Sequence, residues 1–492
     1  MKFISTRGND VVNCSAEAIV KGLANDGGLF VPEKFPNLQN KLADLLELDY
    51  AERASYILGQ FLEEYDTDEL FSACKKAYAK FENNDAAPVV KLDENLFILE
   101  LFHGPTLAFK DIALTILPYL LRKGADITGV KEEILILVAT SGDTGKAALE
   151  GFKDQDGIKI MVFYPSEGVS DMQKLQMRTQ EGSNVNVVAV SGNFDDCQNA
   201  VKRIFSNVEF NNILKENNVI LSSANSINFG RLCPQIAYYF SAYLDLVASN
   251  EITLGDKINF VVPTGNFGNI LAGYYAKLMG LPIDKLVCAS NSNNVLTEFF
   301  NSGEYNIERE FYKTISPSMD ILISSNLERL IFELSNRDAC LTKKRMDELK
   351  STGKYTISTE ELKFLSNNFV ANYCDEEDCL ETIDEYFEEY GYILDTHTSV
   401  AVNVLDSLGV NDKTKTVVLS TASPYKFSQS VLNALTGKNE KDAFKCAEKL
   451  YKLTAEPIPE QISLLKEKEQ RFNEVVDKLE TENAVLNFIN KK

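Results

Sequence analysis

From Leu92 onward, short apolar runs alternate with runs of helical period, and this alternation limits the possible folds more than any other feature. Residues 132–140 (EEILILVAT) and 258–264 (INFVVPT) are typical apolar runs. They are too short for helices and too continuous for strands that expose one face. Parallel strands need long connections such as the helical runs between them, because tight turns join only antiparallel strands. The sequence therefore predicts an α/β fold with mainly parallel sheets.

At 492 residues the chain is too long for one ordinary hydrophobic core, so we expect several domains. Changes in pattern predict an N-terminal α+β domain, a large domain that is discontinuous in sequence, a small domain and a C-terminal helical segment. These parts span residues 1–90, 91–130 with 225–440, 131–224 and 441–492, respectively. Residues from about 330 to 390 are strongly acidic and of helical period, and we interpret them as a helical insertion with a solvated face.

The net charge of −22 at pH 7 argues against nucleic acids and anionic membranes as partners. No apolar run approaches the roughly 18 residues of a membrane-spanning helix, and the N-terminus lacks the layout of a signal peptide. Nine cysteines without framework spacing indicate reduced thiols. The sequence thus predicts a cytoplasmic protein. Cys374 and Cys379 have the wrong spacing for zinc, and with only two histidines we predict no metal site.

One lysine, Lys110, lies within the otherwise apolar and small-residue stretch 101–114 (LFHGPTLAFKDIAL). Burial disfavours the charged form of a lysine and lowers its pKa. The neutral amine forms Schiff bases with carbonyl compounds, including the aldehyde of pyridoxal phosphate. A lysine at the start of a helix, with its stem on apolar surface, is the alternative interpretation. Two anion-binding turns elsewhere in the chain favour the first interpretation.

Both turns contain glycine and lie between a predicted strand and a predicted helix. In residues 263–269 (PTGNFGN), two glycines let backbone N–H groups approach one anion at a helix N-terminus. Taken alone, this turn is also compatible with an ordinary βα connection. Residues 141–146 (SGDTGK) add hydroxyl groups and the charge of Lys146. The first turn lacks the third glycine of a Rossmann fingerprint, and neither is a Walker A loop. We expect both at the carboxyl ends of strands, where ligands bind in open sheets.

Four segments occur in the order HGPTLAFKD, SGDTGKAA, NSINFGR and PTGNFGN along the chain. Together they resemble the signatures of the threonine synthase family, which consists of pyridoxal-phosphate enzymes of fold type II. STRG and GLANDGGLFVPEKFP, near the N-terminus, resemble the N-terminal domain of the longer branch of that family. The resemblance covers nearly the whole chain. It implies a tryptophan-synthase-β-like core of two domains, an N-terminal α+β domain and pyridoxal 5'-phosphate as cofactor.

The resemblance also implies which residues bind this cofactor. Lys110 would form the Schiff base and later move protons on the substrate carbons. Thr421, at the end of the predicted strand VVLST, would face the pyridine nitrogen. The residues that would hold the cofactor phosphate are Gly265, Asn266, Phe267, Gly268 and Asn269.

Substrate-binding roles follow from the same resemblance. The residues expected near the substrate carboxylate are Ser141, Asp143 and Thr144. The residues that align with the NSIN segment of the family are Asn225, Ser226, Asn228 and Arg231. The candidates for binding the substrate phosphate are Lys146, Arg231 and Lys426.

The chain departs from the family pattern in residues 421–427 (TASPYKF). Ser423 and Tyr425 stand where family members often have histidine and alanine. If that histidine helps to bind the substrate phosphate, substrate choice could differ in this protein. Residues 395–401 (DTHTSVA), around His397, also lack a proline that is common in the family, and we expect little effect from that change.

The activity that the resemblance implies is conversion of O-phospho-L-homoserine and water to L-threonine and phosphate, the last step of threonine biosynthesis. A threonine-synthase-like phospholyase is an alternative that Ser423 keeps open, and it would release a 2-oxo acid, ammonia and phosphate. A non-catalytic protein that binds pyridoxal phosphate or senses a ligand is a third. Lys110, the two turns and Thr421 argue against this last alternative. The resemblance further implies a monomer.

Overall fold

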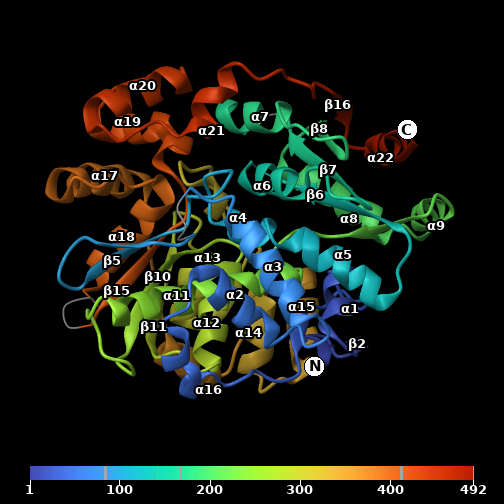
Figure 1. The fold of residues 1–492 in the computed structure, drawn as a ribbon, viewed down its shortest axis with the longest axis horizontal. Helices are drawn as coiled ribbons and strands as arrows, with labels where there is room; N and C mark the ends of the chain where they lie inside the picture. The colour runs from blue at the N-terminus through green and yellow to red at the C-terminus, as the bar shows by residue number, and fades with distance from the viewer. Residues whose placement is uncertain (83–85, 141, 167–168, 410–413, 491–492) are drawn as a thin grey trace.

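Two parallel sheets form the framework of the computed structural model, which describes residues 1–82, 86–140, 142–166, 169–409 and 414–490 (Figure 1). The larger sheet has the strand order β14-β11-β10-β15-β5-β4. Its strands are β4 (Val89–Lys91), β5 (Leu96–Glu100), β10 (Ile258–Pro263), β11 (Ile283–Ser290), β14 (Phe369–Tyr373) and β15 (Thr416–Ser420). Neighbours are parallel except for β4, which is antiparallel to β5. β10 and β15 are buried along their whole length, which explains their mainly apolar sequences.

The smaller sheet has the order β16-β8-β7-β6-β9, and all its neighbouring strands are parallel. Its strands are β6 (Glu133–Ala139), β7 (Ile158–Pro165), β8 (Val185–Ser191), β9 (Val219–Ser222) and β16 (Val475–Asp477). The two sheets confirm the predicted α/β fold. The last strand is a difference, because residues 441–492 were expected to be helical. The β-branched Val475 and Val476 pair with Ala189 and Val190 at the sheet edge, and this pairing prevails over the helical composition around them.

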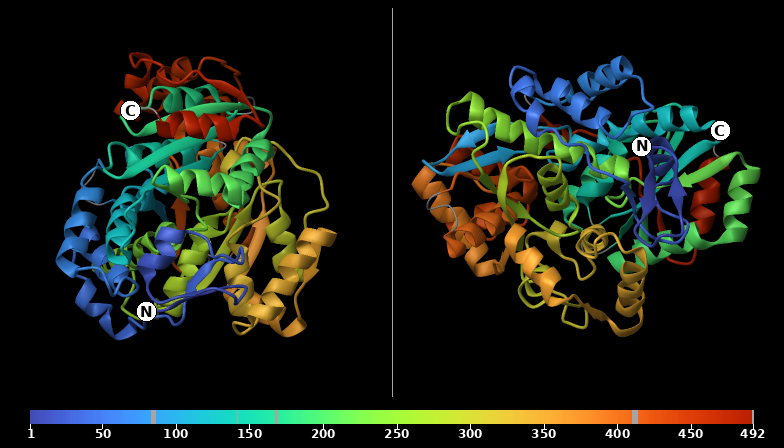
Figure 2. Two further views of the ribbon diagram at one scale, coloured as in Figure 1. Left: turned by 90° about the vertical axis from the view of Figure 1, so that its right-hand side faces the viewer. Right: turned by 90° about the horizontal axis from the view of Figure 1, so that it is seen from below.

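The N-terminal part contains a three-stranded antiparallel sheet of order β2-β1-β3, at the lower end of the left-hand view in Figure 2. Its strands are β1 (Phe3–Ser5), β2 (Val11–Val12) and β3 (Phe30–Pro32). Its helices are α1 (Ser15–Lys21), α2 (Tyr50–Gly59) and α3 (Thr67–Tyr78), with 3-10 turns η1 (Gln39–Lys41) and η2 (Ala43–Leu45). Asp49 and Glu52 form a capping box that fixes the start of α2.

The acidic insertion is not wholly helical. Its helices are α14 (Leu327–Leu334), α15 (Ala339–Thr352), α16 (Thr359–Asn368) and α17 (Glu376–Tyr390). Strand β13 (Lys354–Thr356) pairs antiparallel with β12 (Glu304–Asn306), and β14 forms an edge of the larger sheet beside β11. Phe369 and Ala371 of β14 are buried there. The insertion therefore contributes to the core as well as to the solvated face that the sequence predicts.

The remaining helices cover the two sheets or form the C-terminal segment, which lies beside α7 and the smaller sheet in Figure 1. They are α4 (Lys110–Leu114), α5 (Leu117–Thr128), α6 (Asp143–Phe152), α7 (Asp171–Arg178), α8 (Phe194–Ser206), α9 (Val208–Glu216), α10 (Phe229–Leu232), α11 (Pro234–Ala248), α12 (Gly268–Leu278), α13 (Val295–Ser302), η3 (Pro317–Met319), α18 (Thr396–Leu408), η4 (Pro424–Phe427), α19 (Ser428–Thr436), α20 (Ala443–Thr454), α21 (Glu460–Ser463), η5 (Leu464–Lys466) and α22 (Thr481–Asn490). Across the described ranges, none of these helices has the length and apolar character needed to cross a membrane.

Candidate functional site

Lys110 is the first residue of α4. It contacts Ser318, in the connection between β11 and β14 of the larger sheet, and Asp143, which follows β6 of the smaller sheet. Its side chain is 11% exposed. Nζ donates a hydrogen bond to Ser318 Oγ at 3.1 Å and lies 3.7 Å from Asp143 Oδ2. Burial lowers the pKa of Lys110 to about 8, against the opposing effect of Asp143, and the nearby cations Lys426 and Arg231 lower it further. Such an amine is partly neutral near physiological pH, as a nucleophile or proton carrier must be.

Asp143, the first residue of α6, is the centre of a buried charge cluster. Its Oδ1 accepts hydrogen bonds from Lys426 Nζ at 2.8 Å and from Gln173 Nε2 at 3.1 Å, and its Oδ2 accepts one from Ser318 Oγ at 3.3 Å. Burial alone would raise the pKa of Asp143, but Lys426 and Lys110 hold it well below its ordinary value. The carboxylate therefore links the smaller sheet to two lysines that follow strands of the larger one.

The SGDTGK turn is held by a threonine that precedes it. Thr140 Oγ1 accepts hydrogen bonds from Gly142 N at 3.0 Å and Gly145 N at 2.9 Å. Gly142 has φ 146°, a conformation that residues with a Cβ rarely adopt. Thr144 is partly buried in the first turn of α6, whereas Ser141 lies outside the described residues. The turn thus presents a helix N-terminus at the carboxyl end of β6, as the sequence predicts.

The two lysines predicted for the substrate phosphate have different surroundings. Lys146 Nζ pairs with Glu150 Oε2 at 3.0 Å on the same helix, which holds this charge on α6. Lys426 Nζ donates to Thr106 O at 2.8 Å in addition to its bond with Asp143. Its side chain is 1% exposed. Contacts therefore bring Lys426 into the Lys110 cluster, but they do not bring Lys146 there.

The PTGNFGN turn opens onto the N-terminus of α12. Phe267 has φ 63° and no described side chain caps the helix, so the first N–H groups are available to a ligand. A Cβ at Gly265 would lie 2.6 Å from Ser318 O, so only glycine fits there. Asn269 Oδ1 accepts from Tyr238 OH at 2.5 Å, and its buried Nδ2 has no partner among the described residues. An uncapped helix and an unpartnered donor fit a phosphate group.

Asn326, which the sequence analysis missed, joins this turn to the NSIN segment. Its Nδ2 donates to Ser226 Oγ at 2.9 Å and to Asn266 O at 3.0 Å. The fully buried Arg329 donates from Nη1 to Asn326 Oδ1 at 2.5 Å. A Cβ at Gly268 would lie 3.4 Å from Ser226 Cβ, so the two turns are in close contact. Nothing in the local sequence separates this asparagine from an ordinary helix cap.

Within the NSIN segment, Asn228 has a structural position. Its Nδ2 donates to Ile19 O at 2.9 Å and Ser223 O at 2.8 Å, while its Oδ1 accepts from Gly230 N at 2.9 Å. These bonds occupy its polar atoms and shape the turn into α10. Asn225 begins the segment, and its backbone N donates to Ser223 Oγ at 3.2 Å. The structure therefore brings Ser226 to the PTGNFGN turn, whereas the side chain of Asn228 hydrogen-bonds to backbone groups.

Arg231 is a buried cation with an unused donor. It is 3% exposed and donates from Nη1 to Ala224 O at 2.9 Å. Its Nε has no hydrogen-bond partner among the described residues. Burial lowers the pKa of Arg231 to about 10, against the opposing effect of Asp111. Buried charges are ordinarily paired, so this guanidinium is suited to bind an anionic ligand.

Thr421 follows β15 and lies beside Lys110 in the structure, because its carbonyl accepts from Phe109 N at 2.9 Å. Ser423 and Tyr425, the two residues of this loop that differ from the family pattern, both form hydrogen bonds. Ser423 Oγ accepts from Tyr425 N at 3.3 Å and so caps η4. The Tyr425 hydroxyl donates to Glu456 O in the C-terminal segment. Tyr425 therefore attaches this loop to the C-terminal helices, and Ser423 stabilises the loop itself.

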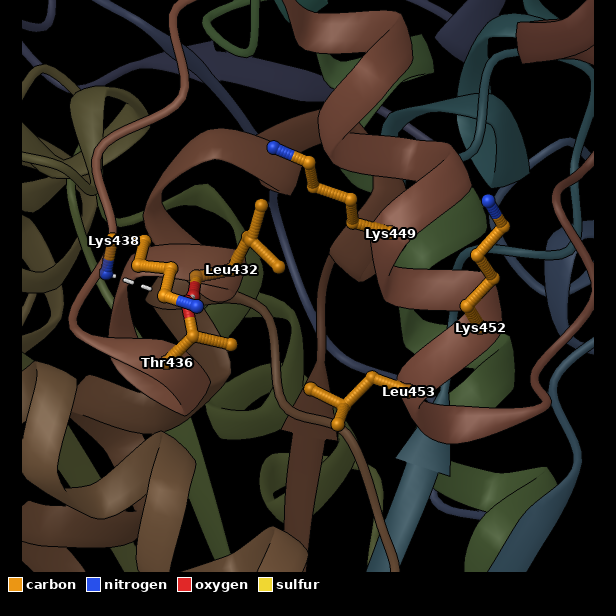
Figure 3. Close-up of a pocket in the computed structure, with 6 residues that line it drawn as sticks. All are labelled: Leu432, Thr436, Lys438, Lys449, Lys452 and Leu453. Carbon is orange, nitrogen blue, oxygen red and sulfur yellow. Dashed lines mark hydrogen bonds between the residues drawn. The ribbon is translucent and has the colours of Figure 1, made fainter.

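An open groove in the C-terminal segment, shown in Figure 3, is separate from these residues. Its volume is about 360 Å³, and it is lined by Leu432, Thr436, Lys438, Lys449, Lys452 and Leu453. Its lysines are exposed to solvent, and Lys449 pairs with Glu440 at 2.7 Å. Exposed charges are screened and contribute little to binding. The candidate site is therefore the buried cluster around Lys110.

Comparison with known proteins shows which class of protein this fold belongs to. Residues 85–422 match the family described as "Pyridoxal-phosphate dependent enzyme". This match covers both parallel sheets apart from β16, and it includes Lys110 and both turns. The fold and the site thus define a pyridoxal-phosphate-dependent enzyme of fold type II. The predicted cofactor is confirmed at this level.

Two further matches flank that region: residues 2–78 match "Threonine synthase N terminus" and residues 398–489 match "Threonine synthase, C-terminal". The chain belongs to the threonine synthase family. It is similar to PLP-bound threonine synthase from Brucella melitensis, with 37% identity, a TM-score of 0.88 and coverage of 100% of both chains. It is 37% identical to threonine synthase of Saccharomyces cerevisiae over 98% of this chain and 97% of that protein.

A second kind of relative is human threonine synthase-like 1, which is 44% identical over 454 residues. These residues make up 88% of this chain and 60% of that protein. This chain therefore corresponds to little more than half the length of that relative. The higher identity to a threonine synthase-like protein leaves the exact reaction as a separate question.

Proposed function

We propose that this protein converts O-phospho-L-homoserine and water to L-threonine and phosphate. The observation that carries the proposal is the buried cluster in which Asp143 lies 3.7 Å from Lys110 and 2.8 Å from Lys426, where connections of the two sheets meet. An amino acid with a second anionic group suits a site that combines a weakly basic lysine with buried cations. The similarity to threonine synthases over the full length of the chain supports this reaction among those that pyridoxal phosphate assists.

The residues present fit pyridoxal phosphate. The open N-terminus of α12 and Asn269 Nδ2 would hold its phosphate, and Lys110 would carry its aldehyde carbon. The Thr421 hydroxyl would meet the ring nitrogen, where an uncharged partner leaves the ring less fully protonated. When bound, the cofactor withdraws electrons from the substrate carbons next to the amino group and so stabilises carbanions.

The chain's own groups would then bind and move protons. Lys110 Nζ, with a pKa of about 8, would both accept and return protons near neutral pH. The first turn of α6, with Thr144, would bind the substrate carboxylate at a helix N-terminus. Arg231, through its unpartnered Nε, and Lys426 would bind the substrate phosphate.

Water must stay away from the site until the last step, in which it adds to the substrate. Asp143 and Lys426 are almost fully buried, so the cluster is already shielded from solvent. The SGDTGK turn belongs to the smaller domain, whereas Lys110 follows a strand of the larger sheet. Movement of one domain relative to the other would therefore open the site for substrate and close it for the reaction.

End-point product analysis of the purified holoenzyme with O-phospho-L-homoserine tests the proposal. Threonine and phosphate should form in equal amounts, and Lys110→Ala should abolish both products. Lys277→Ala is a matched control, because burial also lowers the pKa of Lys277 to about 8 but its Nζ binds Asp284 O at 2.8 Å, at the far end of α12. This control should retain activity. Turnover by Lys110→Ala at near the normal rate would refute the assignment.

A threonine-synthase-like phospholyase is the second candidate. The replacement of the usual loop histidine by Ser423 favours it. This enzyme would eliminate phosphate and release ammonia and a 2-oxo acid. Phosphate accompanied by 2-oxobutyrate, with no threonine, would select the phospholyase.

A further inference from the structure

Ser318 occupies the centre of the Lys110 cluster, although it lies 208 residues further along the chain. Its Oγ accepts a hydrogen bond from Lys110 Nζ at 3.1 Å and donates one to Asp143 Oδ2 at 3.3 Å. A serine hydroxyl has one hydrogen, so donation to Asp143 leaves only lone pairs facing Lys110. The lysine must therefore direct one of its N–H bonds at Ser318.

The backbone of Ser318 is held by a buried histidine. Ser318 N donates to His397 Nε2 at 3.2 Å, so the ring hydrogen is on Nδ1, which contacts Asp395 Oδ1 at 2.9 Å. His397 and Asp395 are 2% and 0% exposed. Asp395 also caps α18 by accepting from the N–H groups of His397 and Thr398. The start of α18 thus fixes Asp395, Asp395 fixes the imidazole, and the imidazole fixes Ser318.

We propose that Ser318 is a positioning residue for Lys110. It fixes the direction of one N–H bond of the free amine and thereby restricts the lone pair, which attacks a carbonyl carbon or accepts a proton, to the two remaining tetrahedral directions. Asp395 and His397 act through Ser318 by holding its backbone. The turnover part of this inference rests on the proposed function, whereas the effect on the free amine does not.

A hydroxyl performs this role without keeping the lysine protonated. The Ser318 hydroxyl is uncharged, so it accepts from Lys110 without favouring the charged amine as a carboxylate does, whereas Asp143, at 3.7 Å, acts on the lysine through its charge. The charged groups that act on Lys110 are Asp143, Lys426 and Arg231. All three remain when the Ser318 hydroxyl is removed. Its removal should therefore change the orientation of the amine and leave the pH at which it becomes neutral in place.

The test uses the full-length protein after removal of its cofactor, with pyridoxal phosphate as the probe. The rate of covalent capture, followed by absorbance, should rise with pH around a midpoint near the Lys110 pKa of about 8. Ser318→Ala should lower this rate about five- to tenfold at every pH, the loss expected for one hydrogen bond, with an unchanged midpoint. Ser318→Thr should restore most of the rate. Ser302→Ala, which removes an exposed helix-end hydroxyl, is the matched control and should have no effect.

A double-mutant cycle tests the role of His397. His397→Ala should slow capture in the wild-type protein but have little further effect in Ser318→Ala, because both changes remove the same orientation. Additive losses would overturn the proposed coupling. An unchanged capture rate in Ser318→Ala, or failure of Ser318→Thr to restore it, would overturn the role of Ser318.

Turnover provides an independent reading. In the holoenzyme, Ser318→Ala should lower kcat about tenfold and change KM less than about threefold, because the substrate contacts remain. A product analysis that selects another reaction would refute the proposed function without affecting the capture result. A normal kcat together with a raised KM would instead identify Ser318 as a substrate-binding residue and contradict the positioning role.

Discussion

Replacing Asp143 by asparagine should strongly destabilise the protein. The carboxylate pairs with Lys426 at 2.8 Å, and the two side chains are 3% and 1% exposed. Asparagine preserves size and one acceptor but removes the charge that compensates Lys426. Removing one member of a buried pair costs about 3–5 kcal/mol, because the remaining ion stays desolvated without its partner. Typical domains have only about 5–15 kcal/mol of stability in total, so this loss is large.

Urea-induced unfolding at pH 7, followed by far-UV circular dichroism, measures the loss. Asp44→Asn is the matched control, because Asp44 pairs with Lys41 at 3.2 Å but both side chains are more than half exposed. The control should cost less than about 1 kcal/mol.

The double variant Asp143→Asn/Lys426→Met sharpens the test. It removes both charges, so it should recover much of the stability that Asp143→Asn loses. The reasoning is refuted if the single variant loses less than about 1 kcal/mol, or if the double variant is no more stable than the single one.

Three further predictions concern Lys110 and the PTGNFGN turn. Because the pKa of Lys110 is about 8 in the folded protein and about 10.4 when unfolded, the unfolded chain binds more protons between these values. The contribution of Lys110 to stability should therefore rise from pH 8 to pH 10, and Lys110→Met should reduce that rise in urea midpoints. Gly265→Ala should weaken cofactor binding at least about tenfold in an absorbance titration, because its Cβ would lie 2.6 Å from Ser318 O, whereas Gly59→Ala, with open space around it, should not. Asn326→Ala should weaken cofactor binding about five- to tenfold through loss of its bonds between the two turns, and an unchanged Kd would contradict that role.

The parallel core of the fold was predictable because burial on both faces leaves a clear mark on the sequence. β10 (INFVVP) is buried throughout, and its sequence is apolar except for Asn259. β14 (FVANY) and β16 (VVD) carry no such mark, because they are short edge strands within charged, helical surroundings. Their pairing with β11 and β8 depends on contacts with distant parts of the chain. Local composition does not contain that information.

The candidate site shows the same division. Lys110 and the two glycine turns are local patterns, and the sequence identifies them as such. Ser318 and Asn326 are ordinary polar residues in the sequence. Folding brings them into contact with partners that lie 208 and 100 residues away along the chain. The substrate-phosphate role of Lys146 stays a prediction. Its position in the motif suggests an anion-binding charge, but its nearest acidic partner, Glu150, is one helical turn away.

The N-terminal domain is a structural part of the site rather than an appendage to it. Thr6 Oγ1 and Arg7 Nη2 donate to Glu328 at 2.6 and 2.8 Å, and Arg329 donates from Nε to Phe30 O at 3.1 Å. These contacts hold the first turn of α14, directly after Asn326, which joins the PTGNFGN turn to the NSIN segment. Without the N-terminal strands, two buried charges on α14 would lose these partners. Leaving buried ions without partners strongly destabilises a folded protein. The position of Asn326, and with it the geometry of the PTGNFGN turn, therefore depends on strands that contain none of the candidate site residues.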